Sequence, residues 1–218
     1  MGSDDLYHKR KAKKARELAR RAGQRKARDR VLIVCEGAKT EPNYLKEMRA
    51  SLNLTNADIE VCGEDCGSDP VSIVRYALER FEEDRDFDRV YCVFDKDKHP
   101  TYSIAVDYAR RKRMPTGRKL ETVKSVPCFE YWVLLHFKAT TKPYVGAGGR
   151  SACDEVTTEL KREFREYGKG MKGLYKKIGD RTDMAIANAR SAMDAAVKTG
   201  TDNPSTEMHQ LVEYLRNL

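Results

Sequence analysis

Three acidic residues, Glu36, Asp95 and Asp97, follow two apolar runs that are far apart in the sequence. Glu36 comes after residues 31–34, and the two aspartates come after residues 90–94. If both runs are neighbouring parallel strands of an open α/β sheet, their carboxyl ends meet at the edge where such sheets bind ligands. Carboxylates gathered there repel one another unless a cation neutralises them. The spacing therefore predicts a divalent metal site, and Mg²⁺ is the natural ion because it favours hard oxygen ligands.

Two further residues are candidates for the same site. Glu130 stands in the apolar and aromatic segment 127–137, where an acid is rarely buried unless it is paired. The alternative is a structural acid at a helix start, a position that the helix dipole favours. Lys169 lies in the glycine-rich basic segment 167–177 and is either a phosphate contact or a solvated loop residue.

The histidines and cysteines do not suggest a second site. His136 is predicted to pack in a helix, and His99 to lie in a surface loop. Cys62 and Cys66 have the spacing of half a zinc site, but no second pair follows at a suitable distance. We therefore expect the cysteines to be reduced and structural. Two of them lie inside predicted core strands and should behave as small apolar residues, namely Cys35 and Cys92.

Alternating strands and helices are predicted to position these residues. Strands are expected over residues 31–35, 59–62, 90–94 and 120–126. Helices are expected over residues 42–51, 103–113, 127–137, 155–167 and 182–198, and two more start at Pro70 and Asn203. This order predicts an α/β fold with a central, mostly parallel sheet of about four strands flanked by helices. The core is expected over residues 31–140 and a helical C-terminal extension over residues 141–218.

Caps, a glycine and apolar stripes define these elements more closely. Thr40 or Glu41 is predicted to cap the first helix, with Pro42 in its first turn, and Asp69 to cap the second. Gly37 is predicted to let the chain turn where a side chain would be in the way. Three helices carry apolar residues at helical spacing, which predicts buried faces formed by Val74, Ala77, Leu78 and Phe81, by Ile186, Ala189, Met193 and Val197, and by Met208, Leu211, Val212 and Leu215.

Composition limits the class of protein. The chain has 218 residues, of which 40% are hydrophobic and 35% are charged, enough for one sizeable core under a polar surface. No apolar run is long enough to span a bilayer and no signal-peptide pattern is present, so we expect a cytoplasmic protein. A dinucleotide-binding oxidoreductase is disfavoured because no Gly-x-Gly-x-x-Gly motif follows the first strand.

The net charge of +8 is concentrated in the first segment of the chain. Residues 1–30 hold 12 of the 42 Lys and Arg residues but only 4 of the 34 Asp and Glu residues. This arm has too few apolar side chains to fold alone and is predicted to be disordered. It either docks on phosphate backbones, with Arg10, Lys13 and Lys14 as candidate contacts, or is a solvated tail.

Five short motifs, in order over residues 31 to about 215, resemble the RloB-like proteins, which include the AbiLii component of phage-abortive systems. The strand ending in Glu-Gly and the later strand ending in Asp-x-Asp resemble the Toprim domain of topoisomerases, primases, OLD-type nucleases and small RNA-maturing nucleases. The motifs are Glu36-Gly-x-Lys-Thr-Glu-Pro-x-Tyr44, Val93-Phe-Asp-x-Asp97, Pro127-Cys-Phe-Glu-x-Trp-x-Leu-Leu-His136, Tyr167-x-Lys169 and Asn203-Pro-Ser-Thr206.

The resemblance implies a Toprim-like Rossmannoid fold and roles for individual residues. Glu36 would be the catalytic acid and a metal ligand, and Asp95 and Asp97 would hold Mg²⁺ or Mn²⁺. Glu130 would be an added acid of the site. Lys169 would contact a phosphate group or the transition state.

Glu41 departs from the pattern of OLD-type members, which usually have an acid one residue closer to the Glu-Gly pair. Capping a helix is an adequate alternative role for it. During phosphodiester cleavage, divalent ions held by carboxylates neutralise the negative charge that develops on phosphate oxygens, and they can activate a water. The nearby basic residues Lys39, Lys96 and Lys98 would bind the nucleic-acid backbone.

These features imply a metal-dependent nuclease acting on DNA or RNA, including tRNA, as the effector of an anti-phage system with an AAA- or ABC-type ATPase partner. A Mg²⁺-dependent phosphatase of the haloacid dehalogenase type also uses Asp-x-Asp. Here, however, Lys98 and His99 replace the expected Thr, and the motif lies on a later strand. A third alternative is a non-catalytic nucleic-acid adaptor that uses the basic arm. A topoisomerase is disfavoured because the chain is too short for strand passage.

Overall fold

The structure is a computed structural model of the chain that describes residues 29–37, 39–61, 69–96 and 99–218, with the backbone alone for residues 59–61. The predicted arm lies almost wholly outside the described residues, and so does the Cys62 and Cys66 pair. None of the described helices is both long and apolar enough to cross a membrane.

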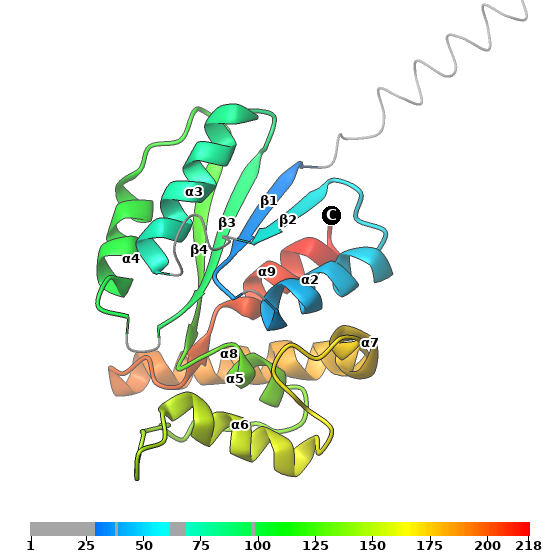
Figure 1. Cartoon of the computed structure of the whole chain (residues 1–218), viewed down its shortest axis with the longest axis vertical. Helices are drawn as coiled ribbons and strands as arrows, with labels where there is room; N and C mark the ends of the chain where they lie inside the picture. Colours follow the sequence, from blue (N-terminus) through cyan, green and yellow to red (C-terminus); the bar gives the residue numbers. More distant parts are fainter. Residues whose placement is uncertain (1–28, 38, 62–68, 97–98) are drawn as a thin grey trace, which may run out of the picture.

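A sheet forms the centre of the molecule (Figure 1). Its strands are β1 (Val31–Cys35), β2 (Ala57–Val61), β3 (Arg89–Asp95), β4 (Lys119–Val126) and β5 (Ser205–Thr206). They stand in the order β2-β1-β3-β4-β5; the first four are parallel, and β5 is antiparallel to β4. The mixed α/β fold and its mostly parallel sheet are confirmed, with one strand more than predicted.

Two helices cover one face of the sheet, α3 (Pro70–Glu83) and α4 (Tyr102–Arg111). Asp69 caps α3 as predicted, because its carboxylate accepts a hydrogen bond from the amide of Val71 at 3.1 Å. All four residues of the apolar stripe predicted for this helix are buried. Helix α3 lies against β3 and β1, and α4 lies beside it against β4 (Figure 1).

The opposite face packs against the C-terminal half of the chain and α2. The helices are α2 (Thr40–Ser51), α5 (Glu130–Leu134), α6 (Ala152–Glu163), α7 (Leu174–Ile178), α8 (Thr182–Thr199) and α9 (Met208–Arg216), with a 3-10 turn at Gly179–Arg181. In Figure 1, α5, α6, α7 and α8 lie below the carboxyl ends of β1 and β3. The helical C-terminal part is confirmed, and the predicted stripe of α9 is buried.

Strand β1 shows why both faces must be covered. Val31, Ile33 and Cys35 belong to the core under the C-terminal helices, whereas Leu32 and Val34 belong to the core under α3 and α4. All five side chains are inaccessible to solvent. This is the burial expected of a parallel strand between two layers, and it confirms the strand predicted over these residues.

The start of α2 differs from the prediction that Thr40 or Glu41 caps it. The N-cap residue is Lys39, whose side chain makes no capping bond, and both predicted caps lie inside the first turn with Pro42. The physical reason is that their side chains have other partners. The Thr40 hydroxyl accepts a hydrogen bond from the amide of Gly170 at 2.9 Å, and the Glu41 carboxyl group turns towards the carboxyl edge of the sheet.

The predicted helix over residues 127–137 is wrong in extent. The α-helix α5 begins at Glu130 and has only five residues. It is flanked by tighter turns, in which Tyr131 donates to the carbonyl of Cys128 at 3.0 Å and Phe137 to that of Leu134 at 2.9 Å. The prediction that this segment is buried is confirmed, because residues 128–136 are all buried.

Three differences concern the later helices. Helix α6 begins three residues before the predicted span 155–167, because Ser151 and Asp154 form a capping box, and it ends four residues early. Helix α7 lies in the glycine-rich segment, where no helix is predicted, and follows Gly173 with a φ of +76°. The predicted buried stripe of α8 is wrong in its second half, because Met193 is only partly buried and Val197 is 80% exposed, and both line a surface hollow instead of the core.

The fifth strand replaces the predicted helix start at Asn203. The amide of Glu207 donates to the carbonyl of Lys124 at 2.8 Å, and the hydroxyls of Ser125 and Thr206 lie 3.0 Å apart. This pairing joins segments about 80 residues apart in the chain, so no local pattern indicates it. Helix α9 starts only after the pairing ends.

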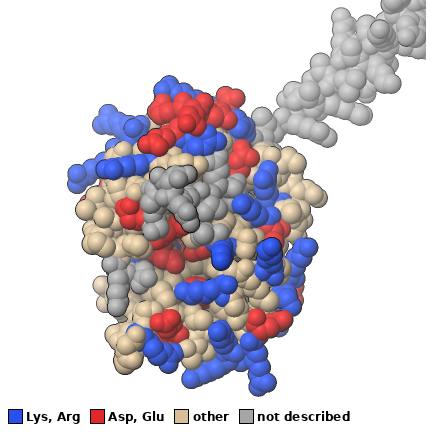
Figure 2. Space-filling model, viewed as in Figure 1, with Lys and Arg blue, Asp and Glu red and all other residues tan. Residues whose placement is uncertain are grey.

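At the amino ends of the parallel strands, acidic and basic side chains pair with one another. The Arg30 guanidinium lies 2.9 Å from the carboxylate of Asp84, and that of Arg89 lies 3.1 Å from Asp29. Figure 2 shows acidic and basic side chains gathered together at this end, at the top of the molecule. Further pairs join Arg118 to Asp88, Arg89 to Glu121 and Arg30 to Asp58.

Candidate active site

Glu36 and Asp95 meet at the carboxyl edge of the sheet, as their spacing predicts. Strands β1 and β3 pair with Cys35 opposite Val93, and the amide of Glu36 extends this pairing by donating to the carbonyl of Val93 at 3.0 Å. The Glu36 carboxylate then turns over the end of β3. Its Oε2 atom accepts a hydrogen bond from the amide of Asp95 at 3.1 Å. The two acidic residues are therefore direct neighbours, although 59 positions separate them in the chain.

Glu41 joins them from the first turn of α2. A Cβ atom placed on Gly37 would collide with the Glu41 carboxyl group. Only glycine leaves room for this close approach, so the predicted steric role of Gly37 is explained by a named partner. The charge of Glu41 interacts with those of Glu36 and Glu130, which brings it into the same cluster.

Glu130 enters the cluster from the short helix α5. Its side chain is 4% exposed, and its Oε1 atom accepts a hydrogen bond from the Tyr167 hydroxyl at 3.0 Å. Burial and the neighbouring charge of Glu130 raise the pKa of Tyr167, which therefore stays a hydrogen-bond donor. Glu130 is thus held by a specific partner, and its charge acts on both Asp95 and Glu41.

The acids of this cluster destabilise one another's ionised forms. The pKa of Asp95 is raised well above its usual range, first by burial and then by the charges of Glu41, Glu130 and Glu36. The backbone amide of Phe129 offsets part of this shift by a hydrogen bond. Burial and the same neighbours raise the pKa of Glu41 to about 7. A group of carboxyl groups with these shifts lacks the positive charge that would balance it.

Two basic groups border the acids. The Nε2 atom of His99 lies 2.9 Å from Oε1 of Glu36, so this residue, predicted to lie in a surface loop, contacts the acidic cluster. The charge of Glu130 raises the pKa of Lys169, which places the ammonium group of Lys169 on the Glu130 side of the cluster.

The structure brings four of the five predicted catalytic residues to this edge, namely Glu36, Asp95, Glu130 and Lys169. The fifth, Asp97, lies outside the described residues, as do the predicted nucleic-acid contacts Lys98, Arg10, Lys13 and Lys14.

The two remaining predicted nucleic-acid contacts have different surroundings. Lys39 is exposed at the start of α2. The ammonium group of Lys96 forms an ion pair with Asp202 at 2.6 Å, so binding a phosphate there would require this pair to open.

Sequence reasoning did not assign three residues firmly to the site: it left the role of Glu41 open between a site acid and a helix cap, favoured a surface loop for His99, and gave Tyr167 no role of its own. Glu41 looks like an ordinary acid of a first helical turn, and His99 like a polar loop residue. The only signal for Tyr167 is its place in the motif with Lys169. His136, in contrast, is packed as predicted: it is inaccessible to solvent and its Nδ1 lies 3.0 Å from the carbonyl of Trp132.

The four cysteines that the structure describes are free thiols and buried. Cys35 and Cys92 lie in the core strands, which confirms their predicted apolar role. Cys128 and Cys153 contact each other beside Glu130. Their mutual hydrogen bond and burial raise the pKa of the Cys128 thiol, so Cys128 does not offer a ready thiolate.

The donor set suits a hard divalent cation. Carboxylate oxygens are the preferred ligands of Mg²⁺ and Mn²⁺, and the raised pKa values of Asp95 and Glu41 reflect positive charge that the cluster lacks. Within the described ranges, no three His, Cys, Asp or Glu side chains converge into a ready coordination sphere. Glu36 and Asp95 are the residues that would hold an ion, together with Asp97 from the segment that is not described.

The fold and the site define a class of protein, an α/β protein with a cluster of acids at the carboxyl edge of a parallel sheet. Residues 31–215 match the family described as RloB-like protein. The chain therefore belongs to the RloB-like family, which confirms the resemblance inferred from the five motifs. The match includes every strand and every residue of the acidic cluster. No curated protein and no solved structure matches the chain.

Proposed function

We propose that this RloB-like protein is a metal-dependent nuclease with a Toprim-like site that hydrolyses phosphodiester bonds in DNA or RNA, including tRNA. One observation carries the proposal: Glu36, Asp95, Glu41 and Glu130 crowd together at the ligand-binding edge of the sheet, where the pKa values of Asp95 and Glu41 are raised. Uncompensated acids are costly to folding, and strongly perturbed pKa values cluster at functional sites. A cation that balances them is the simplest reason to keep them together.

Glu36 and Asp95 would hold Mg²⁺ or Mn²⁺, with Asp97 as the predicted third ligand. When bound, the ion neutralises charge that develops on the phosphate oxygens and can activate a water. The protein orients Glu36 from two sides, through the amide of Asp95 at 3.1 Å and the His99 ring at 2.9 Å. Fixing a ligand in this way reduces the reorganisation needed when the substrate arrives.

Glu130 and Lys169 would act on the substrate side of the site. Tyr167 holds the Glu130 carboxylate by a hydrogen bond, so its orientation is fixed before any ligand binds. Lys169 carries a positive charge next to it, and an ammonium group in this position can contact a phosphate oxygen. Glu41 adds negative charge to the cluster and so favours a divalent cation.

The biological setting belongs to the same proposal and rests on the family resemblance. We expect the protein to act in the cytoplasm as the effector of an anti-phage system, with an AAA- or ABC-type ATPase as its partner. Co-purification of the chain with the product of a neighbouring ATPase gene would test this expectation.

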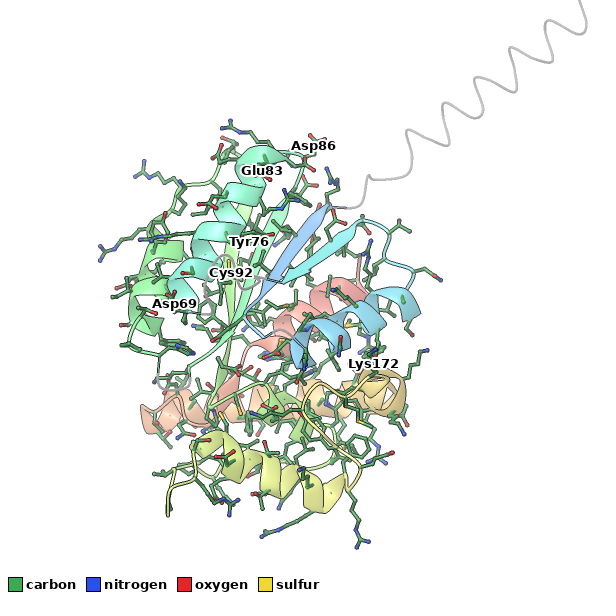
Figure 3. The ribbon with its side chains drawn as sticks, in the orientation of Figure 1. Asp69, Tyr76, Glu83, Asp86, Cys92 and Lys172 are labelled. Atoms are coloured by element: carbon green, nitrogen blue, oxygen red, sulfur yellow. The ribbon has the colours of Figure 1, made fainter. Side chains whose placement is uncertain are left out.

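The metal site is tested by removing its two central acids. Titration calorimetry should show Mn²⁺ binding to the wild-type protein and none to the Glu36→Gln, Asp95→Asn double variant. The matched control is the Glu83→Gln, Asp86→Asn double variant, which removes the same charge from exposed residues at the opposite end of the sheet (Figure 3). Equal Mn²⁺ binding by the two variants would contradict the proposed site.

The reaction is tested with the same three proteins. With Mn²⁺ or Mg²⁺, the wild-type protein and the control should cleave at least one of tRNA, single-stranded DNA and duplex DNA, and the site variant should cleave none. Release of inorganic phosphate from small phosphate monoesters, without cleavage of polymers, would indicate the phosphatase. Binding of polymers by all three proteins without any hydrolysis would indicate the non-catalytic adaptor.

A further inference from the structure

We infer that a row of exposed lysines beside the acidic cluster binds the sugar-phosphate backbone of the substrate. This surface, called here the lysine face, consists of Lys39, Lys46, Lys169, Lys172 and Lys176. The inference rests on the proposed nuclease function and deepens it, because it assigns the surface that guides the polymer to the acids. Three of its residues, Lys46, Lys172 and Lys176, are not implied by any motif.

The lysine face is built by docking the glycine-rich segment on α2. The amide of Gly170 donates to the Thr40 hydroxyl at 2.9 Å, and the Asn43 side chain donates to the carbonyl of Gly170 at 3.2 Å. One helical turn later, Glu47 accepts hydrogen bonds from the amides of Gly173 and Tyr175. Segments about 130 residues apart in the chain therefore form one surface.

Gly170 brings the two segments into contact. Its φ is +77°, a conformation that favours glycine, and a Cβ atom there would lie 3.0 Å from the side chain of Lys39. The Lys39 stem thus packs on the loop that carries Lys169 and Lys172. The two parts of the lysine face are in direct contact as a result.

All five lysines of this face are exposed, and Lys39, Lys46, Lys172 and Lys176 have no acidic partner among the described residues, whereas Lys169 interacts with the charge of Glu130. Elsewhere in the described part of the chain, many basic side chains are paired, as Lys177 is with Glu166 at 2.9 Å and Lys138 with Glu159 at 2.9 Å. The contrast between Lys176 and its neighbour Lys177 is the sharpest. Unpaired cations keep their full charge available for an external anion.

The position of the lysine face relates it to the acidic cluster. Glu41 and Lys39 flank Thr40 at the start of α2, and the charge of Glu130 raises the pKa of Lys169. Figure 2 shows basic side chains over α2 and α7 close to the acids at the centre of the view, and Figure 3 labels Lys172 between these two helices. A polymer held on this face would pass the acids.

The dimensions suit an extended polyanion rather than one small ion. Lys39 and Lys46 are seven residues apart on α2, which places them on one side of the helix at about 10 Å from each other. Phosphates of a duplex strand follow at roughly 3.4 Å along the axis, so this spacing covers about three of them. Several separate lysines reaching successive phosphates give binding that is strong at low salt and falls steeply with salt.

The test changes Lys46, Lys172 and Lys176 to Gln together and leaves the predicted site residues untouched. Its matched control is the Arg111→Gln, Lys112→Gln, Arg113→Gln variant. These three basic residues are also exposed and have no acidic partner in the described part of the chain, but they lie at the end of α4, which runs away from the carboxyl edge. Both variants lose three positive charges and keep the basic arm.

Binding of a 20-nucleotide single-stranded DNA and of the matching RNA is measured by fluorescence anisotropy at several salt concentrations, with EDTA so that no cleavage occurs. For the lysine-face variant we expect roughly 10- to 100-fold weaker binding near 0.1 M salt and a logarithmic salt slope that is smaller by about 2. The control should stay close to the wild type. Equal losses in both variants, or no loss in either, would overturn the inference.

The two proposals fail in different ways. If the lysine-face variant binds more weakly than the control but the wild-type protein hydrolyses no polymer with Mn²⁺, the nuclease proposal falls and the lysine face stands as the surface of an adaptor. If the wild-type protein cleaves polymers and both variants bind alike, the nuclease stands and the lysine face is refuted. Thermal melting of both variants checks that each remains folded.

Discussion

The two ends of the parallel sheet use the same residue types in opposite ways. At the amino ends of the strands, the carboxylates of Asp29 and Asp84 face Arg89 and Arg30, and hydrogen bonds lower the pKa of both acids. At the carboxyl ends, the acids face one another, and the pKa values of Asp95 and Glu41 are raised. One end neutralises its charges within the chain, and the other leaves negative charge for something outside the chain to neutralise.

This difference separates stability from function. Paired charges at the amino ends tie together β1, β3 and the loops before them, where Arg30 and Arg89 also stack on the rings of Phe87 and Tyr214. Crowded acids at the carboxyl ends oppose folding, and the proposed cation would relieve this repulsion. Acids that destabilise the fold at a ligand-binding edge indicate a functional site. The ion pairs at the amino ends of the strands are explained by their contribution to the fold.

The largest expected effect comes from replacing Glu41 and measuring the unfolding free energy as a function of pH. This experiment tests directly whether the two ends of the sheet differ in charge balance. The pKa of Glu41 in the folded protein, about 7, lies above the usual 4.5, so its favourable contribution is present below pH 4.5 and is lost as the pH rises through 7. In EDTA, from pH 5 to pH 8, the Glu41→Gln variant should gain roughly 2 kcal/mol of unfolding free energy relative to the wild type. Urea denaturation at each pH measures this difference.

The comparison with a variant is needed because other groups titrate in the same window. Burial lowers the pKa of His136 to about 4, so its contribution to stability rises with pH and opposes that of Glu41. This contribution is common to both proteins and cancels in the difference. Asp29 and Asp84 stay ionised throughout, because their pKa values are lowered. Mn²⁺ should suppress the difference, and parallel curves in EDTA would show that Glu41 carries no unbalanced charge.

Much of the fold could be predicted because local patterns determine it. The apolar runs that form β1 and β3 are long enough to be buried on both faces, and Asp69 with Pro70 marks the start of α3 without reference to any other segment. Strand β5 could not be predicted in this way. Two residues pair with β4 only because the chain returns there after about 80 residues, and Asn203 to Thr206 resembles a helix start.

The residues of the site also fall into those that local sequence patterns indicate and those that depend on distant contacts. Glu36 and Asp95 could be predicted because each follows a strand, and parallel strands bring their ends together. Glu41 and His99 could not, because their roles depend on tertiary contacts of their side chains, with the space beside Gly37 and with Glu36. A single sequence shows that an acid occupies a first helical turn, but it does not show which way its side chain turns.

Removing Arg89 tests the ion pairs at the amino ends of the parallel strands. Its guanidinium lies 3.1 Å from both Asp29 and Glu121 and 4.4 Å from the ring of Tyr214, so Arg89→Met leaves two acids without their partner. We expect the unfolding free energy to fall by roughly 1–2 kcal/mol in urea titrations, with Mn²⁺ affinity unchanged. Arg85→Met is the control, because this exposed residue pairs with exposed Glu82 on the surface, and its loss should cost under about 0.5 kcal/mol.

The smallest expected effect concerns Asp69. It tests whether an acid belongs to the site because it lies at the carboxyl edge or because its charge is not balanced by neighbouring groups. Asp69 also lies on the carboxyl side of the sheet, at the start of α3, but hydrogen bonds from Ser72, Thr101 and the first-turn amides lower its pKa. Asp69→Ala should lower the unfolding free energy by about 1 kcal/mol, as loss of an N-cap does, and leave Mn²⁺ affinity unchanged. Asp69→Asn should keep most of the cap, because asparagine accepts the same amide bonds. Calorimetry and urea titration on both variants measure these effects. If Asp69→Ala weakens Mn²⁺ binding as strongly as Asp95→Asn does, the whole edge forms the site. The contrast between acids whose charge is balanced and acids whose charge is not would then no longer identify the residues of the site.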